Sequence, residues 1–529
     1  MKTAGLRQKI VGLKAHVLSL LLILLIPLLI NFRHLNEPPA YIHAWTQSDN
    51  YSLALGFQHN GGDLFHPQTL IFNKQQKGFD DPESLTTACD LPLHHWIVSL
   101  AMSVTDCRQP WVFRGMTLAV AILGLWALYF LTFLLTHSWA KSLLVAMVTA
   151  TAPSYAYYSA SFLPTVPALS LAMGGLLFYV YHLKEGKMWM LWVGILLLSL
   201  SMMSRTSFAV LWVAVACFQM LRFMCHEAQW RSWLPFVAGA ALFAAWWLWS
   251  YHLRQQYGSL FLGSLLPVHN KEDFCYVLQN MHDRWRFHYF QRMQHWLYVV
   301  AAVAAVITPW VNRTKANKAH HQLSLWWLLL IWFFGEILFV MAMFQQFCDH
   351  DYYFLDSLFL PIVMLLVGLL GVIPNPLKRW SKVVTLIVVL SLSGLMTAQS
   401  CKMQRIRRLE GVESLQTAVR YKSANRLLED SGYGSKDLRF LTLFSYPQNT
   451  PFVMMDREGY AVMWTNPAIV AHALTFDFDY ILVEDEVYRN EFGNAPVLSR
   501  LQRLAGNGEI SVCVLSDSVL HPVPEDFFK

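Results

Sequence analysis

The sequence is poor in charged residues, and this deficiency says most about the class of protein. Only 14% of its 529 residues are Asp, Glu, Lys or Arg, against about 25% in an ordinary soluble domain. With 26 Gly and 22 Pro, it is neither collagenous nor of low complexity. Apolar residues make up 55% of the chain. A soluble multidomain enzyme would need more polar surface, so the composition indicates a polytopic α-helical membrane protein.

Several sequence signatures are also missing. There is no CxxC pair, no Cys/His spacing typical of zinc sites, and no internal repeat of solenoid or transporter scale. The net charge of +6 is small for this length and suits basic cytoplasmic loops, so we expect no nucleic acid partner. The eight Cys residues can form disulfides outside the cytoplasm or stay free thiols, and the sequence leaves both open.

Long apolar runs predict the membrane spans. A span needs about 20 mostly apolar residues to cross about 30 Å of hydrocarbon. The runs predict about eleven spans, at 17–32, 111–135, 142–158, 164–183, 189–204, 207–221, 234–250, 296–311, 323–344, 357–373 and 383–399. No small-x-small cleavage site follows the first run, so we interpret it as a retained span and not a signal peptide. The shorter run at 96–104 predicts an interfacial or re-entrant helix.

Lys and Arg in the connecting loops predict the orientation. With the N-terminus in the cytoplasm, every inner connection contains basic residues, whereas the outer links 159–163 and 345–356 contain none. This places the first loop (33–110), the middle loop (251–295) and the C-terminal segment outside the cytoplasm. We therefore expect a multi-pass plasma (inner) membrane protein, with a transmembrane domain at 1–400 and an extracytoplasmic domain at 401–529.

The C-terminal segment differs from the rest in pattern. Apolar residues recur at helical spacing over 403–430, and short apolar runs at 438–444, 480–483 and 510–515 are typical of strands. Helical stretches at 466–474 and 487–504 separate the strands. The segment has no Gly-rich phosphate loop. We expect a small α/β domain.

Two acidic residues of the first loop are candidates for chemistry. Asp49 and Asp90 each stand near the start of an apolar helical stretch, among aromatic residues, at the outer face of the membrane. One interpretation is structural, because Asp is a preferred N-cap residue. The other is functional, because a pair of carboxylates suits general base catalysis or cation binding.

The motifs around these acids resemble a known family. Trp45-x-Gln47-x-Asp49 and Asp90-x-Pro92-Leu93, with Phe65-x-Pro67-Gln68 between them, resemble the bacterial branch of the protein mannosyltransferase and aminoarabinose transferase superfamily. These are polyprenyl-phosphate-sugar-dependent glycosyltransferases (glycosyltransferase family 39-type) with the GT-C fold. Two later elements resemble the same family, namely His350-Asp351-Tyr352-Tyr353 and Arg457-Glu458-Gly459-Tyr460.

The resemblance implies a reaction and a set of site residues. Asp49 would be the general base and Asp90 a second catalytic acid, in transfer of a sugar from a polyprenyl-phosphate donor to a hydroxyl of a glycan, lipid or protein. Direct attack predicts inversion at the anomeric carbon. Where the family has a Lys at the end of a span, this chain has Arg205. The candidate substrate-binding residues are Trp45, Gln47, His66, Arg205, Arg284, Arg286, His350, Tyr352 and Tyr353.

Structural alternatives stand beside several of these roles. Arg205, at the outer end of two spans, could contact a lipid phosphate or extend to the membrane interface. Tyr352 and Tyr353 could bind phosphate or sugar, or belong to an interfacial aromatic belt. Glu336 lies within a span, where an acid is either functional or a protonated packing residue. The sequence identifies no cofactor with certainty. A divalent cation bound by Asp49, Asp90, His43 and His94 is an open alternative that their spacing does not demand.

Two other functions compete with the enzyme. A transporter or flippase of a lipid-linked glycan should place ionisable groups and broken helices mid-membrane. This chain instead gathers its carboxylates in outer loops, with Glu336 as the main exception. A non-catalytic scaffold would leave the first-loop acids unexplained unless both are helix caps. We therefore expect a membrane glycosyltransferase.

Overall fold

The structure is a computed structural model that describes residues 2–72, 83–261, 264–284, 288–313, 324–376, 378–463, 466–491 and 496–517. The chain divides into two compact units. The helical unit comprises Met1–Leu35, Arg114–Leu248 and Gly263–Arg405. The mixed unit comprises Asn36–Phe113, Trp249–Leu262 and Ile406–Lys529. The mixed unit thus contains most of the first loop together with the C-terminal segment.

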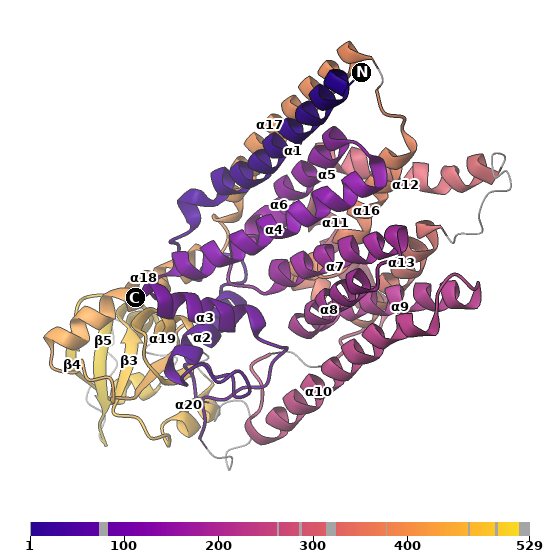
Figure 1. Cartoon of the computed structure of the whole chain (residues 1–529). Helices are drawn as coiled ribbons and strands as arrows, with labels where there is room; N and C mark the ends of the chain where they lie inside the picture. Colours follow the sequence, from indigo (N-terminus) through magenta and orange to yellow (C-terminus); the bar gives the residue numbers. More distant parts are fainter. Residues whose placement is uncertain are drawn as a thin grey trace. The chain divides into compact units, whose positions relative to one another are not determined.

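Every predicted membrane span lies largely in helix within the described residues (Figure 1). The helices that contain them are α1 (Lys2–Asn31), α4 (Pro110–Thr136), α5 (Trp139–Thr151), α6 (Pro153–Tyr158), α7 (Thr165–Glu185), α8 (Met188–Ser204), α9 (Ala209–Met224), α10 (Leu234–Tyr257), α12 (Arg292–Arg313), α13 (Leu325–Ala342), α16 (Phe359–Val372) and α17 (Arg379–Arg407). Among the described residues, seven helices are long and apolar enough to cross a membrane, and three shorter ones are also apolar. The chain is therefore a multi-pass membrane protein by helix length and composition, while eleven spans stay a prediction.

One predicted run is two helices. The run at 142–158 breaks at Ala152, whose extended backbone (φ −61°, ψ 129°) separates α5 from α6. The cause is Pro153, which disfavours helical geometry at the preceding residue and lacks an N–H, but fits the first turn of a new helix.

Helices α7 and α8 pack closely through glycines. A Cβ added to Gly175 on α7 would lie 3.0 Å from the backbone oxygen of Gly194 on α8. Small residues at such positions let two membrane helices approach backbone to backbone. The remaining helices of this unit are short or polar, namely α11 (Lys271–Arg284), α14 (Gln346–Asp349) and α15 (Tyr352–Leu355).

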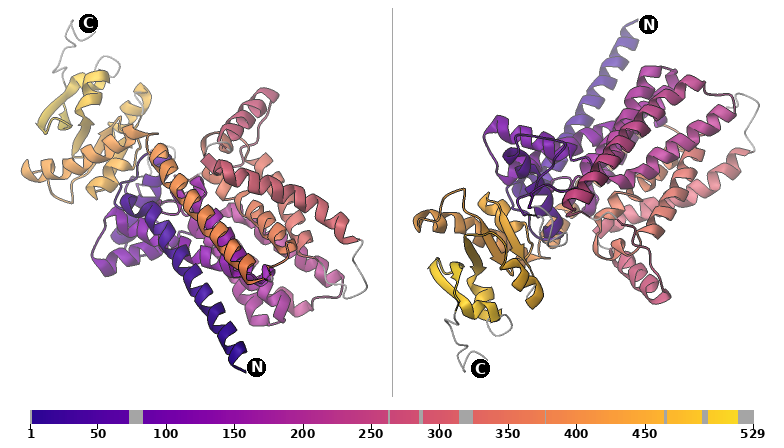
Figure 2. Two further views of the ribbon diagram at one scale, coloured as in Figure 1. Left: turned by 90° about the horizontal axis from the view of Figure 1, so that it is seen from above. Right: turned by 90° about the horizontal axis from the view of Figure 1, so that it is seen from below.

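The mixed unit combines helices with one five-stranded sheet. Its strands run in the order β2-β1-β3-β5-β4. Both β2 and β3 pair with β1 in parallel, and the other neighbours are antiparallel. The strands are β1 (Phe440–Leu443), β2 (Gly459–Val462), β3 (Tyr480–Glu484), β4 (Leu501–Gly506) and β5 (Ile510–Leu515). The helices are α2 (Ala44–His59), α3 (Leu93–Thr105), α18 (Val412–Asp430), α19 (Thr450–Met455), α20 (Pro467–Ala473) and α21 (Asp485–Glu491). Figure 2 shows the sheet from two further directions.

The first loop is built into this sheet. Phe72 donates a backbone hydrogen bond to Gly459 O (3.0 Å), and Gly459 N donates to Leu70 O (3.1 Å). Phe72 also joins the hydrophobic core formed by β1, β2, β3 and β5. A Cβ at Gly459 would lie 2.2 Å from Phe440 O, so only glycine fits this crowded edge. The first loop therefore covers the free side of β2, which would otherwise be a sheet edge.

The predicted strands at 438–444, 480–483 and 510–515 are confirmed as β1, β3 and β5, and the helix at 466–474 as α20. The helix predicted over 487–504 is wrong at its end, because Leu501–Gly506 forms strand β4. This edge strand is mostly exposed and polar, and its apolar residues are spaced as they would be on one face of a helix. Strand β2 was missed because it begins with glycine, a residue depleted in strands, and directly follows the charged pair Arg457-Glu458. Among the described residues, no disulfide joins any of the eight cysteines, whose pairing was left open.

Candidate active site

Asp49 lies inside helix α2 and is not its N-cap. The helix begins at Ala44, and the N-cap is His43, whose backbone is left-handed (φ 56°). Asp90 is not an N-cap either, because α3 begins at Leu93 and its cap is Pro92. The capping interpretation therefore applies to neither acid. The helical pattern is as expected from sequence, since Tyr51, Leu53, Ala54 and Phe57 are all buried.

The carboxylate of Asp49 is buried and bonded to the C-terminal segment. Its side chain is 4% exposed. Asn449 Nδ2 donates a hydrogen bond of 2.7 Å to Asp49 Oδ1. Burial raises the pKa of Asp49 to about 7, although the hydrogen bonds from Asn449 and from Trp45 oppose the rise. A general base working at neutral pH has this pKa.

The other candidates of the first loop have varied surroundings. Gln47 is buried, and its amide nitrogen donates to Ala40 O (2.9 Å) and Ile42 O (2.8 Å), so it fixes the chain that enters α2. The ring of Trp45 meets that of Tyr446 edge to face, with centroids 5.9 Å apart. His66 is 46% exposed and pairs with Asp63 at 2.7 Å. Asp90 is half-buried.

A second group of candidates lies in the helical unit around Arg205. Arg205 follows α8, and its guanidinium forms an ion pair with Asp356, which is fully buried. The Arg205 Nε donates to Asp356 Oδ2 at 3.1 Å, and a terminal nitrogen donates to the same oxygen. The guanidinium carbon also lies 5.5 Å from the Tyr352 ring centre and 5.8 Å from that of Tyr353. The structure therefore brings together three residues that the sequence proposed separately.

Two more polar contacts belong to the segment 346–356. Tyr158 donates its hydroxyl hydrogen bond to Asp351, and both side chains are buried. The ring of His350 packs edge to face against Tyr352 (5.4 Å). Arg284 Nε donates to Cys348 O (3.0 Å), so it holds backbone of this segment. Arg286 lies outside the described residues.

Two alternatives from the sequence concern Glu336 and a divalent cation. Glu336 is 2% exposed in α13 and accepts a 2.8 Å hydrogen bond from Trp332 Nε1, which suits the packing alternative. Within the described ranges, no three His, Cys, Asp or Glu side chains are grouped so that they could hold a metal ion.

Sequence reasoning missed two partners of the candidate residues. Asp356 stands in an outer link that contains three Asp and neither Lys nor Arg, and this grouping of acids was a usable signal. Asn449 carries no local signal, because it lies 400 residues from the carboxylate that it contacts. Only the folded structure, in which the first loop packs on the C-terminal segment, reveals this contact.

The C-terminal end of α2 is fixed by a cluster of charges. His59 Nδ1 lies 2.8 Å from Glu458 Oε1, and its Nε2 lies 3.3 Å from Asp456 Oδ1. Arg108 Nη1 reaches the other Asp456 oxygen at 2.6 Å. Hydrogen bonds to Asp456 and then Glu458 raise the pKa of His59 to about 9. Burial opposes the shift, but the hydrogen bond with His59 and then the charge of Arg108 lower the pKa of Asp456.

This cluster predicts a stability that depends on pH. Because the folded pKa of His59 exceeds its ordinary value of 6.5, its contribution is complete below pH 6.5 and is lost as the pH rises through about 9. We expect His59→Gln to lower the free energy of unfolding by about 1 kcal/mol at pH 6. Thermal unfolding of the purified chain in detergent should show the two proteins converging by pH 10. A gap that widens with pH would contradict this assignment.

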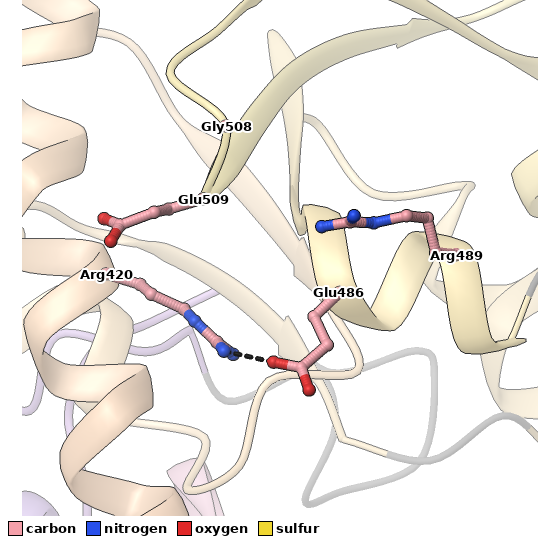
Figure 3. Close-up of a pocket in the computed structure, with 5 residues that line it drawn as sticks. All are labelled: Arg420, Glu486, Arg489, Gly508 and Glu509. Atoms are coloured by element: carbon pink, nitrogen blue, oxygen red, sulfur yellow. Dashed lines mark hydrogen bonds and ion pairs between the residues drawn. The ribbon is translucent and has the colours of Figure 1, made fainter.

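A separate hollow lies on the mixed unit. Figure 3 shows that Arg420, Glu486, Arg489, Gly508 and Glu509 line it. Arg420 pairs with Glu486 and, at 2.5 Å, with Glu484. The charges on its wall therefore compensate one another, and the hollow contains none of the predicted site residues.

Comparison with known proteins gives the fold. No family model matches the sequence. No curated protein matches it either. Among solved structures, ArnT from Cupriavidus metallidurans bound to undecaprenyl phosphate is similar over 95% of this chain and 99% of its own, with a TM-score of 0.59 and 11% identity.

Two further structures extend the likeness. The apo oligosaccharyltransferase of Archaeoglobus fulgidus is similar over 91% of this chain and 71% of its own, at 12% identity and a TM-score of 0.51. The arabinofuranosyltransferase AftD from Mycobacteria is similar over 89% and 36%, at 13% identity and a TM-score of 0.50. All three are GT-C glycosyltransferases. The resemblance inferred from the sequence is thus confirmed at the level of fold, and the chain is a multi-pass membrane protein with the GT-C fold.

Proposed function

We propose that the chain is a membrane glycosyltransferase that moves a sugar from a polyprenyl-phosphate donor to a hydroxyl group outside the cytoplasm. The observation that carries this proposal is the buried carboxylate of Asp49, whose pKa of about 7 lets it accept a proton at neutral pH. The GT-C fold supports the class of reaction. The ArnT structure was bound to undecaprenyl phosphate, which supports the class of donor. The acceptor is a glycan, a lipid or a protein.

The proposed reaction is a direct displacement. The acceptor oxygen forms a bond to the anomeric carbon of the sugar while its proton passes to Asp49. The bond between that carbon and the phosphate oxygen breaks, and the electron pair leaves with the polyprenyl phosphate. Attack from the side opposite the leaving group inverts the configuration at carbon.

The leaving phosphate needs stabilisation by cations more than it needs a general acid. We assign this role to Arg205, with Tyr352 and Tyr353 as neighbouring hydroxyl donors. The Arg205 side chain is 20% exposed, so it is not fully enclosed although it pairs with buried Asp356. Asp356 would orient the guanidinium, as a carboxylate that bonds two of its N–H groups does. Asp90 is proposed as a second acid near the acceptor.

Release of polyprenyl phosphate tests the proposed function. The purified chain would be placed in proteoliposomes with polyprenyl-phosphate sugars and an envelope extract, both from the cells in which it occurs. Mass spectrometry would then follow free polyprenyl phosphate. We expect release that requires both the chain and the extract. Passage of intact lipid-linked sugars across the bilayer, without release, would contradict the enzyme and support the transporter.

A further inference from the structure

The C-terminal segment contacts helix α2 at two places. Asn449, directly before α19, bonds Asp49 in the middle of α2, and Asp456, directly after α19, pairs with His59 at the end of α2. His59 is ten residues after Asp49 along the helix, a rise of about 15 Å. Helix α19 therefore lies along α2. Contacts at both ends of α19 hold Asn449 in position beside Asp49.

Asn449 occupies an N-cap position without using its side chain as a cap. Asparagine is among the preferred N-cap residues because its side-chain oxygen accepts a backbone N–H of the first turn. Here Asn449 makes no such bond, although its backbone stands at the start of α19. Its amide nitrogen bonds Asp49, and its Oδ1 is buried with no hydrogen-bond partner among the described residues. The side chain is fully buried, so the forgone bond is not replaced by water at the surface.

The direction of this hydrogen bond selects one state of the carboxyl group. The amide nitrogen can only donate, and an ionised carboxylate can only accept. The bond is therefore strongest when Asp49 is ionised, which is the state that a general base requires. A carboxylate has about four acceptor sites, so Asn449 and Trp45 leave sites for an incoming hydroxyl.

We propose that Asn449 is a positioning residue for Asp49, and that its amide holds the carboxylate in place for proton transfer. The role rests on the proposed function. It makes the C-terminal segment part of the catalytic apparatus and not only a covering domain, because the residue that orients the base comes from that segment.

The groups around α2 let a pH profile report on Asp49. Tyr446 faces the carboxylate, and burial followed by the charge of Asp49 raises its pKa, so it is neutral at pH 7. On α3, burial lowers the pKa of His94 to about 3 and that of His95 well below 6.5. Arg108, Lys436, Asp456, Glu458 and His59 all belong to the cluster at the far end of α2. We therefore assign to Asp49 the fall in reaction rate on the acidic side of the pH profile, the acidic limb, with a midpoint near pH 7.

The test is the pH dependence of polyprenyl phosphate release by the full chain carrying Asn449→Ala. Loss of the donor removes an interaction with the ionised form, so we expect the acidic side of the pH–rate profile to move up by about one pH unit and the rate at pH 7 to fall about fivefold. Raising the pH should restore much of kcat. Asn449→Asp keeps the shape but adds a second carboxylate, and its limb should move further in the same direction.

Thr450→Val is the matched control. Thr450 is the next residue, is fully buried, and its hydroxyl has no hydrogen-bond partner within the described chain, so this nearly isosteric change should leave the pH profile unchanged. Equal loss of rate at every pH in Asn449→Ala would mean a merely structural role and would overturn the inference.

Infrared difference spectroscopy separates this inference from the proposed function. The protonated carboxyl signal of Asp49, identified by its absence in Asp49→Asn, can be titrated without any turnover. A titration midpoint that rises in Asn449→Ala supports the inference even if no sugar is transferred. An unchanged midpoint would refute it, whereas missing polyprenyl phosphate release by the unaltered chain would refute only the proposed function.

Discussion

Replacing Asp49 by asparagine is expected to lower the rate of sugar transfer by about 10²- to 10⁴-fold, the usual contribution of a general base. The change is isosteric, and the new side chain keeps an oxygen that can accept the hydrogen bond from Asn449. We therefore expect unaltered folding and donor binding. Initial rates of polyprenyl phosphate release, measured beside thermal unfolding, would show loss of kcat with an intact protein.

Ser48→Ala is the control for this variant. Ser48 is the neighbour of Asp49 on α2, is equally buried, and donates its hydroxyl hydrogen bond to Trp45 O (2.8 Å). Loss of the Ser48 hydroxyl perturbs the same helix but leaves the Asp49 carboxylate in place. The rate of polyprenyl phosphate release should therefore change little. Full activity of Asp49→Asn, or an equal loss in both variants, would remove Asp49 from the mechanism.

Replacing Arg205 by alanine is expected to damage both stability and donor binding. The substitution leaves the buried Asp356 carboxylate without its ion-pair partner, which costs about 3–5 kcal/mol in comparable sites. Arg205→Lys retains the charge but not the planar set of donors, so its effect should be intermediate. Thermal unfolding and binding of undecaprenyl phosphate to the detergent-purified chain would measure the two effects separately.

The double variant Arg205→Ala/Asp356→Ala distinguishes structure from function. Removing both charges removes the unpaired buried carboxylate, so the protein should recover most of its stability. If Arg205 binds the donor phosphate, undecaprenyl phosphate binding should stay weak in the double variant. Binding equal to that of the unaltered chain would show that the pair serves packing alone.

Much of the fold could be predicted because its signals are local. Each predicted membrane span lies largely in helix, since a membrane helix must be apolar over most of its length. The buried strands β1, β3 and β5 were also apparent as apolar runs. The edge strand β4 was not apparent from the sequence, because the exposed side of an edge strand need not be apolar.

The candidate site could be predicted only in part. The first-loop motif directed attention to Asp49, but the sequence could not separate an N-cap from a buried base, because the two differ by where the helix begins. Gln47, interpreted as substrate-binding, donates to the backbone that enters α2. The partners Asn449 and Asp356 depend on contacts between segments distant in sequence, which one chain read alone does not reveal.

The most direct test is an experimental structure of the full chain with undecaprenyl phosphate and a non-transferable sugar analogue. We predict that the Asp49 carboxylate, still bonded to Asn449, faces the anomeric carbon from the side opposite the phosphate, with room for one hydroxyl between them. A lipid phosphate bound elsewhere, or an Asp49 side chain turned away from the sugar, would contradict general base catalysis by this residue.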